Sequence, residues 1–144
     1  MSRISWCTAT VVATFVAIAA CGGEPVVPKG RPCVEADADA MRRMRAHFNL
    51  SEESTAGFEP NPNKVDLDHD GQLDRIYTFE VEGATPLTVV YAMQAACGEP
   101  LGEIQGTVTV LPTKTRNFKD LKATSGGSWK ICRLGDDAYH CAEP

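Results

Sequence analysis

The sequence predicts an α+β fold, a small disulfide-stabilised antiparallel β-meander of about six strands with one N-terminal helix packed on it. Helical spacing of apolar residues is confined to residues 34–48, whereas residues 64–144 contain short alternating runs separated by turn residues. Short links between consecutive strands favour antiparallel pairing. Four cysteines, Cys33, Cys97, Cys132 and Cys141, fall within residues 33–144, and an even number is typical of a disulfide framework.

The helix is expected at 34–48, where Met41, Met44 and Phe48 recur at helical spacing. Acidic side chains lead this segment and arginines follow, an order that complements the helix dipole. The methionines are therefore expected to face the core. Asn49 is expected to cap the C-terminal end of the helix, because asparagine tolerates the left-handed conformation found there.

Strands are expected at 75–82, 87–93, 103–111 and 118–124, and a final hairpin at 129–141. Most of these segments alternate between apolar and polar residues, which predicts strands with one buried face. The segment 87–93 is instead a nearly continuous apolar run, which suits the centre of a sheet.

The four cysteines of this region allow three pairings. If residues 136–137 form a two-residue turn, Cys132 faces Cys141 at a non-hydrogen-bonded pair, which is close enough for a cross-strand disulfide. Cys33 then pairs with Cys97. A turn shifted by one residue would break this register. A zinc site is the weaker alternative, because the chain has only three histidines and no CxxC motif.

The N-terminal segment has the parts of an export signal. Arg3 supplies a positive charge, residues 4–20 carry no charged side chain, and small residues lead to Cys21. This uncharged run is shorter than the stretch of about 20 apolar residues that a transmembrane helix needs. The sequence Ile18-Ala19-Ala20-Cys21 resembles the lipobox of bacterial lipoproteins; an ordinary secretory signal with a chance cysteine is the alternative.

The lipoprotein resemblance implies that residues 1–20 are removed as a signal peptide and that Cys21 carries a diacylglyceryl group, which anchors the protein to a membrane. The Pro- and Gly-rich residues 21–32 are then a short tether, and residues 33–144 form a single globular domain. The expected location is the bacterial cell envelope, on a periplasmic or surface face, and Gly22 favours the outer membrane.

The strongest chemical motif is an acidic loop of the form DxDxDGxxD. Its candidate metal ligands are Asp66, Asp68, Asp70, the backbone carbonyl of Gln72, and Asp74. Alternate carboxylates repel one another unless a cation neutralises them, and Gly71 permits the sharp turn. The motif resembles the calcium loops of EF-hands, dockerins and FG-GAP repeats, which implies one structural Ca²⁺. Because Tyr77 replaces the bidentate Glu of an EF-hand, the expected Kd is about 10⁻⁴–10⁻³ M. A solvated turn without metal is the alternative.

The remaining features narrow the class of function. Residues 21–144 carry 13 basic and 19 acidic side chains, a net charge of −6 that disfavours binding to nucleic acid. No catalytic motif is recognisable. We therefore expect a non-enzymatic binding or structural module of the envelope, which presents Trp129, Tyr91 or Tyr139 to a protein or glycan partner. The alternative is a periplasmic inhibitor of a hydrolase of the lysozyme or protease type.

Overall fold

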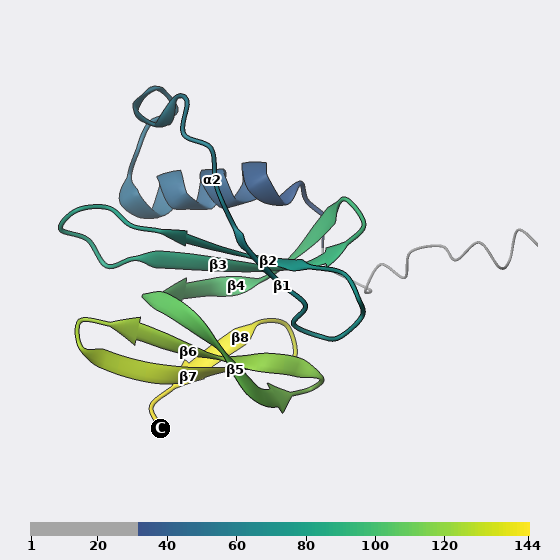
Figure 1. Cartoon of the computed structure of the whole chain (residues 1–144). Coiled ribbons are helices and arrows are strands. Elements are labelled where there is room, and N and C mark those ends of the chain that lie inside the picture. The colour runs from purple at the N-terminus through teal and green to yellow at the C-terminus, as the bar shows by residue number, and fades with distance from the viewer. Residues whose placement is uncertain (1–31) are drawn as a thin grey trace, which may run out of the picture.

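The computed structural model describes residues 32–144. The predicted signal segment 1–20, the predicted lipidation site Cys21 and the tether up to residue 31 lie outside the described residues. The described chain forms three layers, in which a helix covers one face of a four-stranded sheet and a second four-stranded sheet covers the other face (Figure 1). Between residues 32 and 144, no helix is both long and apolar enough to cross a membrane.

The helix α2 (Ala36–Phe48) confirms the predicted helical segment, and a short 3₁₀ turn (Glu53–Thr55) follows it. Glu35 caps the start, because its carboxylate accepts hydrogen bonds from backbone amides of the first turn. Asn49 adopts the left-handed conformation (φ 54°) and its amide donates to the Arg45 carbonyl, as expected for a C-cap.

The first sheet has the strand order β1-β2-β3-β4 and is antiparallel throughout. Its strands are β1 (Asn63–Val65), β2 (Asp74–Phe79), β3 (Leu87–Gln94) and β4 (Cys97–Gln105). All residues of β3 except the last are buried, because the helix covers one face of this strand and the second sheet covers the other. The prediction of a central strand at 87–93 is therefore confirmed.

The second sheet has the order β5-β6-β7-β8. Its strands are β5 (Thr107–Thr115), β6 (Phe118–Ser125), β7 (Ser128–Leu134) and β8 (Tyr139–Ala142). The number of strands differs from the expected six or so: residues 32–144 form eight, and the single strand expected at 103–111 is the end of β4 followed by the start of β5. Gly106 separates them with φ 110°, and a Cβ at this position would lie 2.4 Å from the Thr124 carbonyl oxygen. The chain therefore passes from one sheet to the other at a point that only glycine fits.

Residues of the first sheet face two separate hydrophobic cores because successive side chains of a strand point to opposite faces. Tyr77 packs in the core that includes Met44 of the helix. Its neighbour Ile76 packs on the other side with Val90 and with Leu121 of the second sheet. The first sheet is thus the middle layer, with a hydrophobic core against each of its faces.

A polar network joins the helix to the first sheet. The Asp39 carboxylate accepts hydrogen bonds from Arg43 Nε (2.6 Å), from the Tyr91 hydroxyl (2.8 Å) and from Arg42. Arg43 also donates to Glu103 of β4 at 2.7 Å. Although burial acts in the opposite direction, the hydrogen bonds from Arg43, Arg42 and Tyr91 hold the pKa of Asp39 below its ordinary value.

The disulfides follow the pairing that the sequence favours. In the β7–β8 hairpin Cys132 lies opposite Cys141, and the two residues form a disulfide. The predicted turn at 136–137 therefore has the expected register, with the Gly135 amide donating to the Ala138 carbonyl at 2.8 Å. The second disulfide joins Cys33, just before the helix, to Cys97 at the start of β4.

Candidate metal centre

The acidic motif forms the loop between β1 and β2, at the right-hand end of the molecule in Figure 1. Leu67 lies within this loop and is fully buried. Its carbonyl accepts a hydrogen bond from the Lys119 amide of β6 at 2.8 Å. A loop that begins in the first sheet is therefore held against the second.

Side-chain hydrogen bonds to the backbone set the shape of the loop. Asp66 accepts from the amides of His69 (2.7 Å) and Gly71 (3.2 Å), and Asp70 accepts from the amide of Gln72 (2.7 Å). Such bonds are typical of Asx turns. Gly71 has φ 87°, a left-handed conformation that glycine adopts without steric cost. The carboxylates are therefore held by the loop's own amides.

Asp74, the last aspartate of the motif, is a buried residue with 1% of its surface exposed. Its carboxylate accepts hydrogen bonds from the Leu67 amide (2.7 Å) and from the Met93 amide of β3 (2.8 Å). Burial raises the pKa of Asp74 to about 6, and the negative charges of Asp68 and Asp70 add to the rise, while the two amide bonds oppose it. Asp74 thus links the loop to the core, but its negative charge there is opposed only by backbone amides.

Three of the predicted ligands converge. Asp66, Asp68 and Asp74 each offer one carboxylate oxygen, and these atoms all lie within 4.8 Å of one another. Within residues 32–144, no Lys, Arg or His forms an ion pair with any of the loop aspartates. Burial raises the pKa of Asp68, helped by the charges of Asp70 and Asp66. The cluster could therefore hold a metal ion, whose charge would relieve this repulsion.

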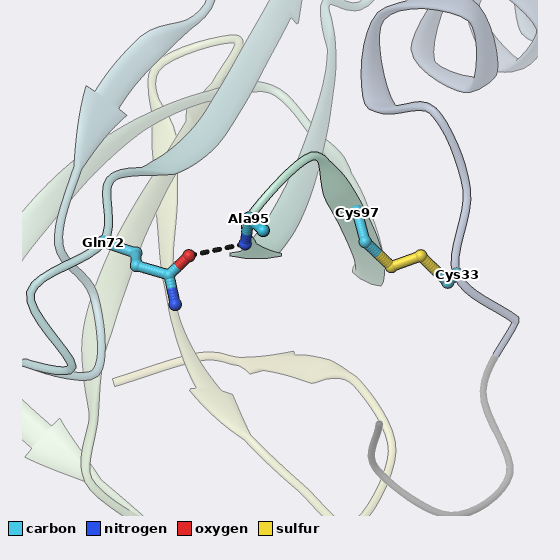
Figure 2. Close-up of a disulfide and its surroundings, with 4 residues drawn as sticks. All are labelled: Cys33, Gln72, Ala95 and Cys97. Atoms are coloured by element: carbon cyan, nitrogen blue, oxygen red, sulfur yellow. Dashed lines mark hydrogen bonds between the residues drawn. A yellow bond between two sulfur atoms is a disulfide. The ribbon is translucent and has the colours of Figure 1, made fainter. Parts of the chain in front are cut away.

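One of the predicted ligands is placed differently. Asp70 lies outside the converging group, and its carboxylate bonds to the backbone amide and side-chain amide of Gln72. The side chain of Gln72 extends to the turn between β3 and β4, where its Oε1 accepts a hydrogen bond from the Ala95 amide at 2.6 Å (Figure 2). The backbone carbonyl of Gln72 stays a predicted ligand.

Sequence reasoning does not single out Glu99, which lines a hollow of about 290 Å³ together with Asp68 and Asp70. Glu99 belongs to β4, and no spacing rule relates it to the acidic motif. Only the fold, which brings the end of β3 and the start of β4 beside the loop, places this acidic side chain there.

The aromatic residues expected to face a partner differ from the prediction. Tyr91 is fully buried and Tyr139 is 6% exposed, because both contribute to the hydrophobic cores. Tyr91 therefore forms no part of a ligand surface, whereas Tyr139 borders the cleft beside Trp129 with little of its surface exposed. Trp129 is 41% exposed and lines a cleft of about 410 Å³ that also contains residues of β4, β6 and β8.

Within the described residues, the three aspartates are the one group of at least three His, Cys, Asp or Glu side chains whose ligand atoms converge. Comparisons of the chain with protein-family models, with curated proteins and with solved structures give no match.

Proposed function

We propose that this protein is a lipid-anchored, non-enzymatic binding or structural module of the bacterial cell envelope that carries one structural Ca²⁺ in its acidic loop. The convergence of Asp66, Asp68 and Asp74 carries the calcium part of the proposal. Two oxygens that bind one Ca²⁺ at 2.3–2.6 Å lie at most about 5 Å apart, and these oxygens lie within 4.8 Å of one another. Asp70 and the carbonyl of Gln72 are the remaining candidates, and water would complete the coordination.

The chain's own contacts explain how an ion held here would act on stability. Calcium would supply the positive charge that the loop aspartates lack. Asp74 connects the loop to the Met93 amide in the central strand β3, and Leu67 connects it to β6. An ion bound only by the folded chain stabilises it by mass action, so the expected role is structural.

The anchoring part rests on the lipobox-like sequence that ends at Cys21. The two disulfides support it, because disulfides persist in proteins exported from the cytoplasm. The exposed Trp129 and its cleft are the surface that we assign to a protein or glycan partner.

A calcium titration of the purified mature chain in detergent tests the metal site. Asp68→Asn is the sharpest variant, because Asp68 makes one hydrogen bond, to the Asp70 amide, which Asn can retain. With a Kd of about 10⁻⁴–10⁻³ M, 10 mM Ca²⁺ should stabilise the wild type by about 1–3 kcal/mol. Asp68→Asn should lose most of this gain and bind with little heat in calorimetry.

Asp137→Asn is the matched control, because Asp137 lies in the other acidic turn and its side chain is 78% exposed. This variant should respond to calcium as the wild type does. A wild type that shows neither binding heat nor a higher Tm would contradict the calcium site and leave a solvated acidic turn.

A hydrolase inhibitor is the second candidate, favoured by the turn beside the Cys132–Cys141 disulfide. The side chains of Asp136 and Asp137 in this turn are 88% and 78% exposed, so a rigid, acidic loop is available to enter an active site. Inhibition of a lysozyme or protease that is lost on replacing both residues with alanine would favour this candidate over the structural module.

A further inference from the structure

One end of the molecule combines an apolar surface with the point where the chain enters the domain. A hollow of about 470 Å³ is formed mainly by Val34, Ala95, Ala96 and the Cys33–Cys97 disulfide. Glu35 also borders it, but its carboxylate is engaged by the first amides of the helix, at 2.6 and 3.1 Å. The hollow is therefore mostly apolar in character.

An exposed leucine of the acidic loop lies beside this apolar surface. Leu73 is 56% exposed and shares with Ala95 a second hollow, whose other lining residues include Lys64, Gln72 and Arg75. The hydrogen bond from the Ala95 amide to Gln72 holds the loop beside the β3–β4 turn (Figure 2). We call this surface the tether end, and it consists of Val34, Leu73, Ala95 and Ala96 around the disulfide.

The tether end is also where the chain outside the described residues joins the domain. Thirty-one residues precede Pro32, and the disulfide fixes Cys33 to Cys97 within the hollow itself. This step rests on the proposed function, in which Cys21 carries lipid. The residues 21–32 can then span at most about 40 Å when fully extended, so the lipid keeps Cys33 within about 40 Å of the membrane.

We infer that the tether end rests on the lipid bilayer, with Leu73 and Ala96 at the level of the headgroups. A short linker raises the local concentration of this surface at the membrane to the millimolar range. A modest apolar contact, too weak to hold a free domain, is therefore sufficient. In this orientation the opposite end of the first sheet, at the β2–β3 loop, faces away from the bilayer (Figure 1).

Tryptophan quenching in lipid vesicles tests this orientation. Ala96→Trp reports on the tether end, and Ala84→Trp, in the exposed β2–β3 loop at the opposite end (Figure 1), is the matched control. Both variants carry Trp129→Phe, and the full chain is processed by the cell and reconstituted in phosphatidylcholine vesicles. These vesicles carry no net charge, which avoids repulsion from the acidic loop. Lipids brominated near the headgroup should quench Ala96→Trp at least twofold more than Ala84→Trp.

The same samples distinguish a failure of the proposed orientation from a failure of the proposed lipid anchor. Flotation with the vesicles and the mass of the N-terminal peptide report whether Cys21 carries lipid. If the chain is lipidated and floats, but both tryptophans are quenched equally, the orientation is wrong and the anchored module stands. If the chain neither carries lipid nor floats, the anchoring proposal fails and the orientation fails with it. Equal Tm values for the two variants confirm that neither substitution disturbs the fold.

Discussion

Two buried aspartates, one in the helix interface and one in the acidic loop, have opposite electrostatic surroundings. Asp39 is 8% exposed and Asp74 is 1% exposed. Asp39 accepts hydrogen bonds from the cationic Arg43 and the Tyr91 hydroxyl, and its pKa lies below the ordinary value. Asp74 accepts from two backbone amides and lies near other carboxylates, and its pKa rises to about 6. Two carboxylates that are similarly buried can therefore differ in whether a positively charged side chain neutralises them.

The difference shows where a cation can matter. At the helix interface the protein supplies its own positive charge, so the charged form of Asp39 is the stable one. In the loop the protein supplies amide dipoles alone, so the neutral form of Asp74 persists up to a pH of about 6, well above the ordinary range of a carboxyl group. A metal ion would therefore complete the loop and has no equivalent role beneath the helix.

The largest expected effect is that of Asp39→Ala. Without this carboxylate, the buried Tyr91 hydroxyl loses its acceptor and Arg43 loses one of its two acidic partners. Breaking a buried ion pair by removing one member costs about 3 kcal/mol. Urea unfolding at pH 7 should show this loss in the free energy of unfolding, together with weaker protection of the helix amides in hydrogen exchange.

Asp37→Ala, in the same turn of the helix, is the control. Asp37 also bonds to the sheet, through Arg75 at 2.8 Å and through the Tyr77 hydroxyl, but its side chain is 47% exposed. Solvent replaces much of what is lost at such a position, and the expected cost is about 1 kcal/mol. Equal losses for the two variants would contradict the view that burial makes the Asp39 network the stronger one.

The two aspartates should also give stability opposite dependences on pH. The pKa of Asp74 is about 6 in the folded chain against an ordinary 3.8, so the folded state binds the extra proton and loses stability as pH rises from about 4 to about 6. The expected loss is about 3 kcal/mol. Asp39 has a lowered pKa, so its contribution is present above pH 4 and is lost as pH falls below that value.

Urea unfolding from pH 3 to 7 in EDTA isolates the effect of Asp74 when the wild type is compared with Asp74→Asn. The free energy of unfolding of the variant should lack the decrease between pH 4 and 6. Calcium should reverse the sign of that slope in the wild type, since the ion binds the ionised carboxylates. A wild type and an Asp74→Asn variant with the same profile would show that Asp74 titrates normally.

Local patterns in the sequence were sufficient for part of the fold. The helix, its Asn49 cap and the Cys132–Cys141 register depend on residues close in sequence, whose spacing and turn chemistry are informative. The division into two sheets depends on Gly106. In the sequence this glycine is indistinguishable from another position in the alternating pattern of a single strand. Its requirement for glycine comes from the Thr124 carbonyl of another strand, which no local pattern contains.

The candidate site divides in the same way. The spacing of the acidic motif predicts the convergence of Asp66, Asp68 and Asp74, because all three belong to one loop. The bond between Asp39 and Tyr91 could not be predicted, since Tyr91 lies 52 residues away in the chain. The bond between Gln72 and Ala95 joins segments 23 residues apart and was missed for the same reason.

The smallest expected effect concerns this last bond. Gln72→Ala removes the acceptor of the Ala95 amide, and an exposed neutral hydrogen bond contributes about 1 kcal/mol. Gln105→Ala, an exposed glutamine of β4, is the control and should change stability by less than about 0.5 kcal/mol. Calcium affinity should be measured together with the free energy of unfolding. Gln72→Ala should weaken calcium binding several-fold, because the loop loses its link to the turn that leads to the Cys33–Cys97 disulfide. An unchanged calcium affinity with a reduced stability would show that the loop holds its carboxylates in place without help from that turn. The surroundings that distinguish Asp74 from Asp39 would then be set by the loop alone.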